Sequence, residues 1–482
     1  MKFTVLSHAG LLIEHKHIQI ICDPWLIGSC YWRSWWNFPE PPSELISDLK
    51  PDFIYLTHLH WDHFHGASLT KLFDPSTRVL VPKVPTRRMV RDLGYLGFRN
   101  VIELPHGTSI QLGADLTLHS YQFGLGVDSA AMFSTHNTTL LDCNDCKTFG
   151  LPLRQITNRF PRIDFVLRSH SSASPIPYCV DGYKERFPAL RTQYDYIEEF
   201  SRFALSVGAR YAIPFASNHC FLHRDTYHFN ETAVRPEAVR DRFRRLAEET
   251  NSNGECVVMT PGSTWSEEHG FKIATFDFSN SAAYIRDLRT KHQSTLDRQY
   301  EKEDKTKADF EAFSDYFTKF LAAIPWLVRQ YLGFRVVFRT TDAAGEHNWA
   351  VDMAGNKIEA LTDGRRGDCV VLETPALVLN DCAAKNMFSV WTASKRLTIH
   401  LSRTGGLRTV TMFLDLLDFY ELETLPLSKN VSPRSIAVRW RRWREVVEVV
   451  RLIVKHKVRG RRFDIPSLYS LPGEKTEKDS SA

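Results

Sequence analysis

Hydrophobic and polar residues alternate in short runs over the first 280 residues, which is typical of a strand-rich unit with helices between the strands. The apolar runs at 3–14 and 17–23 predict two strands forming a hairpin. DFIYLT at 52–57 predicts a buried strand that leads into a loop and a short helix at 67–73. Further short strands are expected at 79–81, 100–103, 115–121, 127–135 and 138–142, and helices at 184–208 and 235–249.

The pattern changes near residue 280. A chain of 482 residues exceeds one ordinary core, so we expect two domains. Residues 1–280 would form the first domain and residues 281–304, which are highly charged, a connecting helix or linker. Residues 305–465 would form a smaller α+β domain, and the polar residues 466–482 a disordered tail.

Composition narrows the class of protein. Apolar residues make up 43% and charged residues 24%, which is typical of globular proteins. The N-terminus lacks a signal-like apolar region, and no apolar run reaches about 18 residues, so we expect a cytoplasmic protein without a membrane partner. Nine cysteines without a dense spacing favour reduced thiols. A net charge of +5 does not imply a nucleic-acid partner.

Residues 434–462 combine helical apolar periodicity with many arginines and lysines. Because glutamates interrupt the basic run, we expect its apolar stripe to pack against a core and its charged face to lie in solvent. Binding of phosphate groups or of an acidic redox partner is the alternative interpretation.

The strongest chemical signal is the run His58-Leu-His60-Trp-Asp62-His63, on a loop directly after the buried strand. Three imidazoles and one carboxylate in six residues suit zinc, iron or manganese. His58 and His60 alternate, so they can converge on one ion from an extended backbone, while Asp62 and His63 can hold a second. A polar surface loop with accidental histidines is the much weaker alternative.

Several later residues lie at strand ends and could complete such a centre. Asp145 follows the apolar strand TTLLDCND, and His219 and His223 follow YAIPFAS. A dinuclear centre needs a bridging carboxylate and a further imidazole, and these residues supply both types. Asp23, at the end of IICD, could accept a hydrogen bond from the histidine loop or could simply begin a turn before Pro24.

With these residues the chain resembles the metallo-β-lactamase superfamily, and more narrowly the metallo-β-lactamase-like part of CMP-N-acetylneuraminate hydroxylase. The narrower resemblance is carried by short motifs, namely ICDPWL at 21–26, WW at 35–36, EPP at 40–42, DC at 145–146, PFA at 214–216 and TPGST at 260–264. It implies an α+β fold, a four-layered αββα sandwich, followed by the C-terminal domain. It also implies two divalent metal ions, with His58 and His60 on the first, Asp62, His63 and His223 on the second, and Asp145 between them.

The chain departs from the family pattern in two ways. The superfamily places a histidine before the strand that leads to the bridging aspartate, but here the segment reads YQFGLGVDS, so Asp128 and His119 are the nearest candidates for the missing ligand. A Rieske cluster needs Cys-x-His and Cys-x-x-His pairs, and only Cys220-x-x-His223 is present. An oxygenase would therefore take electrons from a separate Rieske or ferredoxin-type protein.

Weaker candidates surround this motif. His170, in RSHSSASPIPY, could contact substrate or metal, although a hydrogen-bonded loop histidine is the safer interpretation. The aromatic loop at 31–36 could wall a substrate pocket or merely pack against the first domain.

Three functions follow from this picture. The first is an iron-dependent oxygenase that hydroxylates a small polar substrate of nucleotide-sugar type, as the narrower resemblance implies. The second is a zinc- or manganese-dependent hydrolase of an ester, amide or phosphodiester, with Asp62 or Asp145 orienting the nucleophile. The third is a metal-binding scaffold without catalytic activity.

Overall fold

The first layer of the structure is an eight-stranded sheet. The computed structural model describes residues 1–124, 128–187, 190–362, 370–402 and 406–458, together with Ile465, Leu468, Tyr469 and Leu471. The strand order is β18-β17-β1-β2-β3-β6-β7-β8. The bounds are β1 (Lys2–Val5), β2 (Leu11–His15), β3 (Ile18–Cys22), β6 (Phe53–Tyr55), β7 (Arg78–Pro82), β8 (Val101–Leu104), β17 (Thr264–Ser266) and β18 (Gly270–Lys272).

A seven-stranded sheet faces the first one, in the order β16-β14-β13-β12-β11-β10-β9. Its strands are β9 (Thr108–Gln111), β10 (Thr117–Phe123), β11 (Asp128–Ser134), β12 (Thr139–Asn144), β13 (Phe165–Ser169), β14 (Tyr211–Phe215) and β16 (Glu255–Cys256). Apolar side chains of the two sheets, such as Phe3 and Ile20 from one and Phe133 and Phe165 from the other, form one buried cluster. The sheets therefore pack face to face.

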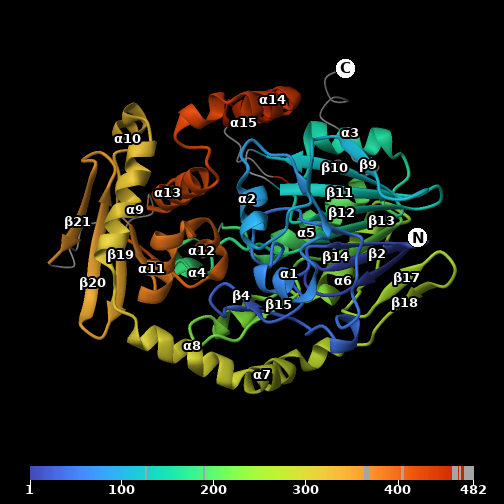
Figure 1. Cartoon of the computed structure of the whole chain (residues 1–482), viewed down its shortest axis with the longest axis horizontal. Helices are drawn as coiled ribbons and strands as arrows, with labels where there is room; N and C mark the ends of the chain where they lie inside the picture. Colours follow the sequence, from blue (N-terminus) through green and yellow to red (C-terminus); the bar gives the residue numbers. More distant parts are fainter. Residues whose placement is uncertain are drawn as a thin grey trace.

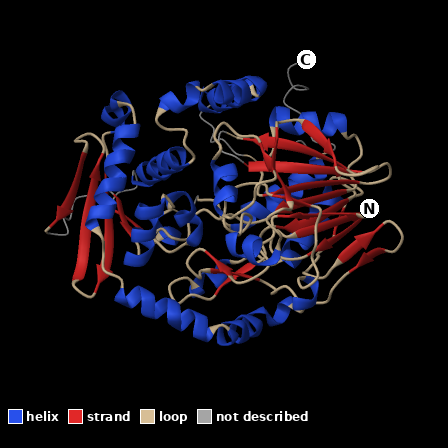
Figure 2. Ribbon diagram, in the orientation of Figure 1, coloured by secondary structure: helices blue, strands red, loops and turns tan. Residues whose placement is uncertain are grey.

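Helices cover both outer faces. α1 (Gly66–Leu72) and α2 (Arg88–Tyr95) share a core with the first sheet through Leu69, Met89 and Leu93. α3 (Gly150–Arg159), α5 (Gln193–Ser206) and α6 (Pro236–Glu249) cover the second sheet. A small sheet lies beside them and consists of β4 (Ser29–Cys30), β5 (Trp35–Asn37) and β15 (His219–Phe221). The short helix α4 spans Tyr183–Arg186. This arrangement confirms the predicted four-layered αββα sandwich (Figure 2).

The N-terminal segment differs from the expected hairpin of two strands. It forms three strands, because residues 7–10 make a turn between β1 and β2. Gly10 permits that turn, since a Cβ atom at this position would lie 2.4 Å from Ser7 Oγ. The turn carries His8.

Residues 281–304 are helical. α7 (Ser281–Lys291) and α8 (Gln293–Lys305) run along one edge of the molecule and connect its two parts (Figure 1). Their buried residues are few, namely Ser281, Ile285, Leu288 and Leu296, which explains the highly charged sequence.

The C-terminal part contains a five-stranded sheet in the order β21-β20-β19-β22-β23. Its strands are β19 (Arg335–Asp342), β20 (Gly345–Asp352), β21 (Lys357–Leu361), β22 (Val370–Glu373) and β23 (Thr398–Leu401), and its helices are α9 (Phe310–Ala323), α10 (Trp326–Leu332), α11 (Ala376–Lys385), α12 (Phe388–Ser394) and α13 (Gly406–Glu421). An aromatic core joins them, with Phe313, Phe338 and Trp391 among its members. Tyr31, Trp32 and Trp35 of the first domain belong to the same cluster, so the two parts share a core.

The last two helices return to the first domain. α14 (Pro433–Arg441) and α15 (Trp443–Val458) lie along the upper edge of the view in Figure 1. Val449 and Leu452 pack on the core under α3, as expected for an apolar stripe, but five apolar residues of the described part of these helices are exposed, contrary to that expectation, namely Ile436, Trp440, Trp443, Val446 and Val450. Within the described residues, no helix has the length and apolarity needed to cross a membrane.

Part of the expected C-terminal tail is ordered against the first domain. Tyr469 and Leu471 are buried, and the Tyr469 hydroxyl lies 3.0 Å from Arg168 Nη2. The other residues of 466–482, apart from Leu468, lie outside the described residues.

Candidate metal centre and substrate cavity

The histidine motif occupies a loop that is fixed at both ends. β6 leads into Thr57 and the motif, and α1 follows, where His65 accepts a hydrogen bond from Ser68 N at its N-terminus. Asp23 accepts hydrogen bonds from Thr57 N (2.8 Å), Thr57 Oγ1 (2.6 Å) and Asn144 Nδ2 (2.8 Å). Asp23 Oδ2 also lies 2.7 Å from His63 Nδ1, so it fixes the orientation of that ring, as one interpretation of the sequence expected.

His58, His60 and Asp145 form a first group of donors, with ligand atoms within 4.8 Å of one another. His58 Nε2 lies 2.9 Å from His60 Nδ1, and His58 Nδ1 lies 3.0 Å from Thr57 Oγ1. Burial, with the neighbouring His63 and His60, lowers the pKa of His58 well below its ordinary value, so the ring is neutral at pH 7. A neutral imidazole is the form that binds a metal ion.

His8, Asp62 and His63 form a second group of the same kind. Asp62 Oδ2 lies 3.1 Å from His8 Nε2 and 3.4 Å from His63 Nε2, and the Tyr31 hydroxyl donates to Asp62 Oδ1. Asp145 Oδ2 lies 3.4 Å from His63 Nε2, so this carboxylate contacts both groups. Although burial opposes ionisation, interaction with His63 holds the pKa of Asp62 well below its ordinary value and lowers that of Asp145.

The donor set fits divalent metal ions. His8, His58, Asp62 and His63 are buried, with exposed fractions of 0–2%. Burying so many imidazoles and carboxylates together is unfavourable in a protein unless the groups are paired or bind a metal. Two adjacent trios that combine imidazole and carboxylate suit iron, zinc or manganese.

Sequence reasoning missed His8. It lies in the turn between β1 and β2, where His8 N donates to Asn37 Oδ1 at 3.0 Å. The sequence pattern predicted one continuous strand over 3–14 and therefore no turn at His8. A single histidine also has no spacing to other ligands that would indicate a metal site. The Ser-His-Ala-Gly sequence, with a glycine closing a tight turn, was the available clue.

The structure places three of the four additional candidates near these groups. Asp128 begins β11 and lines the same cavity as His58 and His60. Burial raises the pKa of Asp128, and the interaction with His60 is the largest effect that lowers it. The His219 ring lies 5.3 Å from the His8 ring and stacks on Trp35 at 3.6 Å. His170 is buried, and burial, followed by the charges of Lys147 and His8, lowers its pKa to about 3.

His119 lies elsewhere, contrary to its candidacy as a ligand. His119 Nε2 lies 3.0 Å from Ser134 Oγ, and its ring packs 5.0 Å from that of Phe160. It lies near the start of β10, whereas the end of that strand, at Phe123 and Gly124, reaches the cavity. His119 is therefore a packed strand residue.

His223 lies outside the two groups, unlike in the ligand set that the resemblance implied, and belongs to a third group of potential ligands with Asp225 and Glu303. The chain turns after β15, so His223 faces α8, and its Nε2 lies 3.2 Å from Glu303 Oε2. Arg396 of the C-terminal part contacts Glu303 at 3.0 Å and Asp225 at 2.9 Å. This cluster of His223, Asp225, Glu303 and Arg396 joins the two parts of the chain, and His8 stands where His223 was expected.

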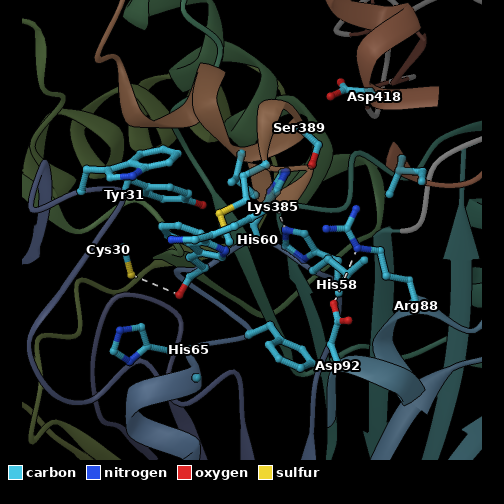
Figure 3. A pocket seen from close by; sticks show the side chains of 18 of the residues that line it. Cys30, Tyr31, His58, His60, His65, Arg88, Asp92, Lys385, Ser389 and Asp418 are labelled. Carbon is cyan, nitrogen blue, oxygen red and sulfur yellow. Dashed lines mark hydrogen bonds and ion pairs between the residues drawn. The ribbon is translucent and has the colours of Figure 1, made fainter. Parts of the chain in front are cut away.

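A cavity of about 900 Å³ opens beside the first group. Figure 3 shows His58 and His60 facing it, with Tyr31 on one side and Arg88 on the other. Its wall combines both parts of the chain, since it includes Asp381, Lys385, Met387, Ser389, Val390, Asp418 and Leu422 of the C-terminal part. Trp32 Nε1 donates to Asp381 Oδ2 at 2.9 Å, so the aromatic loop connects the two walls.

The paired sheets, their outer helices and the His-x-His-x-Asp-His loop at the sheet edge together define a metallo-β-lactamase fold. The chain resembles CMP-N-acetylneuraminic acid hydroxylase, and the mouse protein is 28% identical over 152 residues, or 30% of this chain and 26% of that protein. No protein-family profile matches.

A longer match is to a protein of Mycobacterium tuberculosis named as a Rieske 2Fe-2S iron-sulfur protein, which is 28% identical over 278 residues. That match covers 55% of this chain and 53% of the relative, so the chain spans about half the length of this group of curated relatives.

Solved structures give weaker similarities. An isothiocyanate hydrolase from gut bacteria of Delia radicum has a TM-score of 0.40 and 16% identity, covering 55% of this chain and 99% of that one. A variant of the CmlA β-hydroxylase has a TM-score of 0.37 and 16% identity, covering 55% of this chain and 53% of that one. The named proteins thus include both hydroxylases and hydrolases.

Proposed function

We propose that the protein is an iron-dependent oxygenase that hydroxylates a small polar substrate, for example a nucleotide sugar, with electrons from a separate Rieske or ferredoxin-type protein. The observation that carries this proposal is the pair of imidazole–carboxylate groups joined through Asp145, one of which opens on a cavity of about 900 Å³. The relatives named as hydroxylases and as Rieske proteins support the choice of reaction and of electron donor.

In this proposal two metal ions are held by adjacent donor sets. His58, His60 and Asp145 would hold the first, with Asp128 as a further carboxylate, and His8, Asp62 and His63 would hold the second. Asp145 would contact both, and His170 and His219 lie close enough to the second set to support it. When bound and reduced, iron supplies dioxygen activation.

The chain's own residues would orient the donors and exclude water. Asp23 holds the His63 ring, and Tyr31 donates to Asp62. Burial, together with Asp62, raises the pKa of Tyr31 well above its ordinary value, so the phenol keeps this proton at neutral pH. The Tyr31 and Trp61 rings stack 5.7 Å apart on one side of the cavity and shield the donors from solvent.

Charged side chains of the cavity would bind the substrate. Lys147, Arg88 and Lys385 supply cations, and Asp92 and Asp418 supply carboxyl groups. Lys147 Nζ donates to Ser169 Oγ at 2.9 Å, which fixes its position near the first donor group. Such a lining suits a substrate that carries both hydroxyl and anionic groups.

The test combines elemental analysis of the purified full chain with oxygen uptake. We expect close to two irons per chain, and oxygen consumption coupled to a hydroxylated product when a reduced ferredoxin or Rieske protein and a panel of nucleotide sugars are supplied. The His60→Ala variant should lose both metal and uptake. Turnover under strict anaerobiosis with zinc as the sole metal would overturn the proposal.

The hydrolase remains the second candidate, because a donor set rich in imidazole also suits zinc. In that reaction a bound water would have its pKa lowered to about 7, and Asp62 or Asp145 would orient it. Hydrolysis of an ester, amide or phosphodiester by the zinc- or manganese-loaded chain, without oxygen uptake, is the result that would favour this function.

A further inference from the structure

The stripe formed by Ile436, Trp440, Trp443, Val446 and Val450 faces solvent along α14 and α15. These side chains are 42–73% exposed. Ile436 and Trp440 are four residues apart on α14, and Trp443, Val446 and Val450 are three and four residues apart on α15, so each set lies on one side of its helix. The Trp440 and Trp443 rings lie 6.5 Å apart across the break at Arg442 and join the two sets. The exposed Leu427 and Val431 precede them, so the exposed apolar residues continue before α14.

Several polar side chains of the same helices contact the first domain. Arg434 contacts Glu103 at 2.9 Å, and Arg442 donates to Gly124 O at 2.8 Å. Glu445 accepts from Gly124 N at 3.1 Å, and Glu448 accepts from Leu151 N at 2.5 Å. A helix that packs on a protein core normally presents its apolar side to that core, so the orientation here is largely reversed.

The exposed charges on this segment are positive. The exposed basic residues are Lys429, Arg441, Arg444 and Arg451. Residues 427–452 contain two carboxylates, Glu445 and Glu448, and both side chains turn toward the protein. In sequence, residues 455–462 add five more lysines and arginines. The segment therefore attracts a negatively charged surface.

We propose that α14 and α15 lie flat on an anionic lipid surface. Exposed tryptophans and aliphatic side chains flanked by arginine and lysine are typical of helices that bind in the interface of a membrane without crossing it. Figure 1 shows the pair on an edge of the molecule, where a planar surface can reach it. This inference is independent of the metal chemistry.

The experiment is flotation of the full metal-loaded chain with unilamellar vesicles. Vesicles of phosphatidylcholine with 30% phosphatidylglycerol should carry the protein at low salt, and pure phosphatidylcholine should carry much less. The Trp440→Ser/Trp443→Ser double variant should bind at least tenfold more weakly. The matched control is Tyr194→Ser, which removes an exposed aromatic residue elsewhere and should leave binding unchanged.

Charge variants test the second half of the proposal. Lys429→Gln, Arg444→Gln and Arg451→Gln should each weaken binding to the anionic vesicles about fivefold, with little effect on metal content. Absence of flotation at low salt, or equal flotation of the double-tryptophan variant, would overturn the proposal. If sedimentation shows a dimer that the double variant abolishes, and vesicles are not bound, the stripe is a contact between two copies and the membrane proposal is wrong.

Discussion

At the residue scale, His8 and His223 provide a matched pair of substitutions. Both are fully or almost fully buried histidines near carboxylates, but His8 contacts Asp62 in the second donor group and His223 contacts Glu303 at the junction with α8. We expect His8→Ala to lose about one metal equivalent per chain, because ligand removal weakens the site. We expect His223→Ala to retain its metal. Elemental analysis after gel filtration measures both.

The same two variants can also contradict the assignment of His8 as a metal ligand. A His223→Ala chain that loses metal while His8→Ala keeps it would restore the set implied by the family resemblance. Circular dichroism of both variants is needed, because His223→Ala also removes a contact between the two parts of the chain.

Sequence reasoning could identify the contiguous donors but not the distant ones. His58, His60, Asp62 and His63 are close in sequence, so their spacing alone indicates a metal site, and Asp145 was indicated by its place at a strand end. His8 and His223 could not be distinguished in this way, because the path of the chain after a turn or a strand decides which side chain faces the centre.

At the element scale, α8 is held to the small sheet and to the C-terminal part through one buried carboxylate. The Glu303 side chain is 5% exposed and contacts His223 and Arg396. Burial would raise its pKa, but interaction with His223 and Arg396 lowers it from 4.5 to about 2. The ionised carboxylate therefore stabilises the junction.

We expect Glu303→Gln to lower the free energy of unfolding by about 3 kcal/mol at pH 7, because Arg396 would keep a buried charge with one partner fewer. A folded-state pKa below the unfolded value gives stability that is complete above about pH 4.5 and is lost as the pH falls toward 2. The difference between wild type and variant should therefore shrink over that range. Urea unfolding at pH 7, 5 and 3.5 tests this, and a difference that is constant with pH would contradict the role of this carboxylate.

The sequence predicted most elements of the first domain, since strands such as β7, β11 and β12 have clear apolar runs with turn residues between them. It did not predict which side of α14 and α15 faces the protein. An apolar stripe can be located from periodicity, but its direction is set by the ion pairs that Arg434 and Glu448 make with residues about 300 positions away.

At the scale of the whole molecule, the cavity requires both parts of the chain. Lys385 on α11 lines it and forms an i,i+4 ion pair with Asp381 at 2.6 Å. The two walls come from distant segments, so sequence patterns alone could not identify the cavity. The predicted division of the chain near residue 280 did not indicate that residues from both sides of it line one cavity.

We expect Lys385→Ala to raise the KM for an anionic substrate roughly tenfold, because a charge-assisted contact is lost, while metal content stays unchanged. Lys319→Ala is the matched control, since Lys319 forms an equivalent i,i+4 pair with Asp315 at 2.6 Å on α9 and does not line the cavity. Steady-state oxygen uptake provides the measurement. Equal KM values for the two variants would exclude Lys385 from substrate binding.

The strand that precedes His8 has a consequence for how the protein is made. β1 lies between β2 and β17, so one of its two neighbours is synthesised only after residue 260 has been added to the chain. On the ribosome, β1 can pair with β2 early, whereas β17, its other neighbour, is added about 250 residues later. The strand that leads into His8 therefore gains its second neighbour only when the last strands of the first domain have left the exit tunnel, long after the donors up to Asp145 have been synthesised.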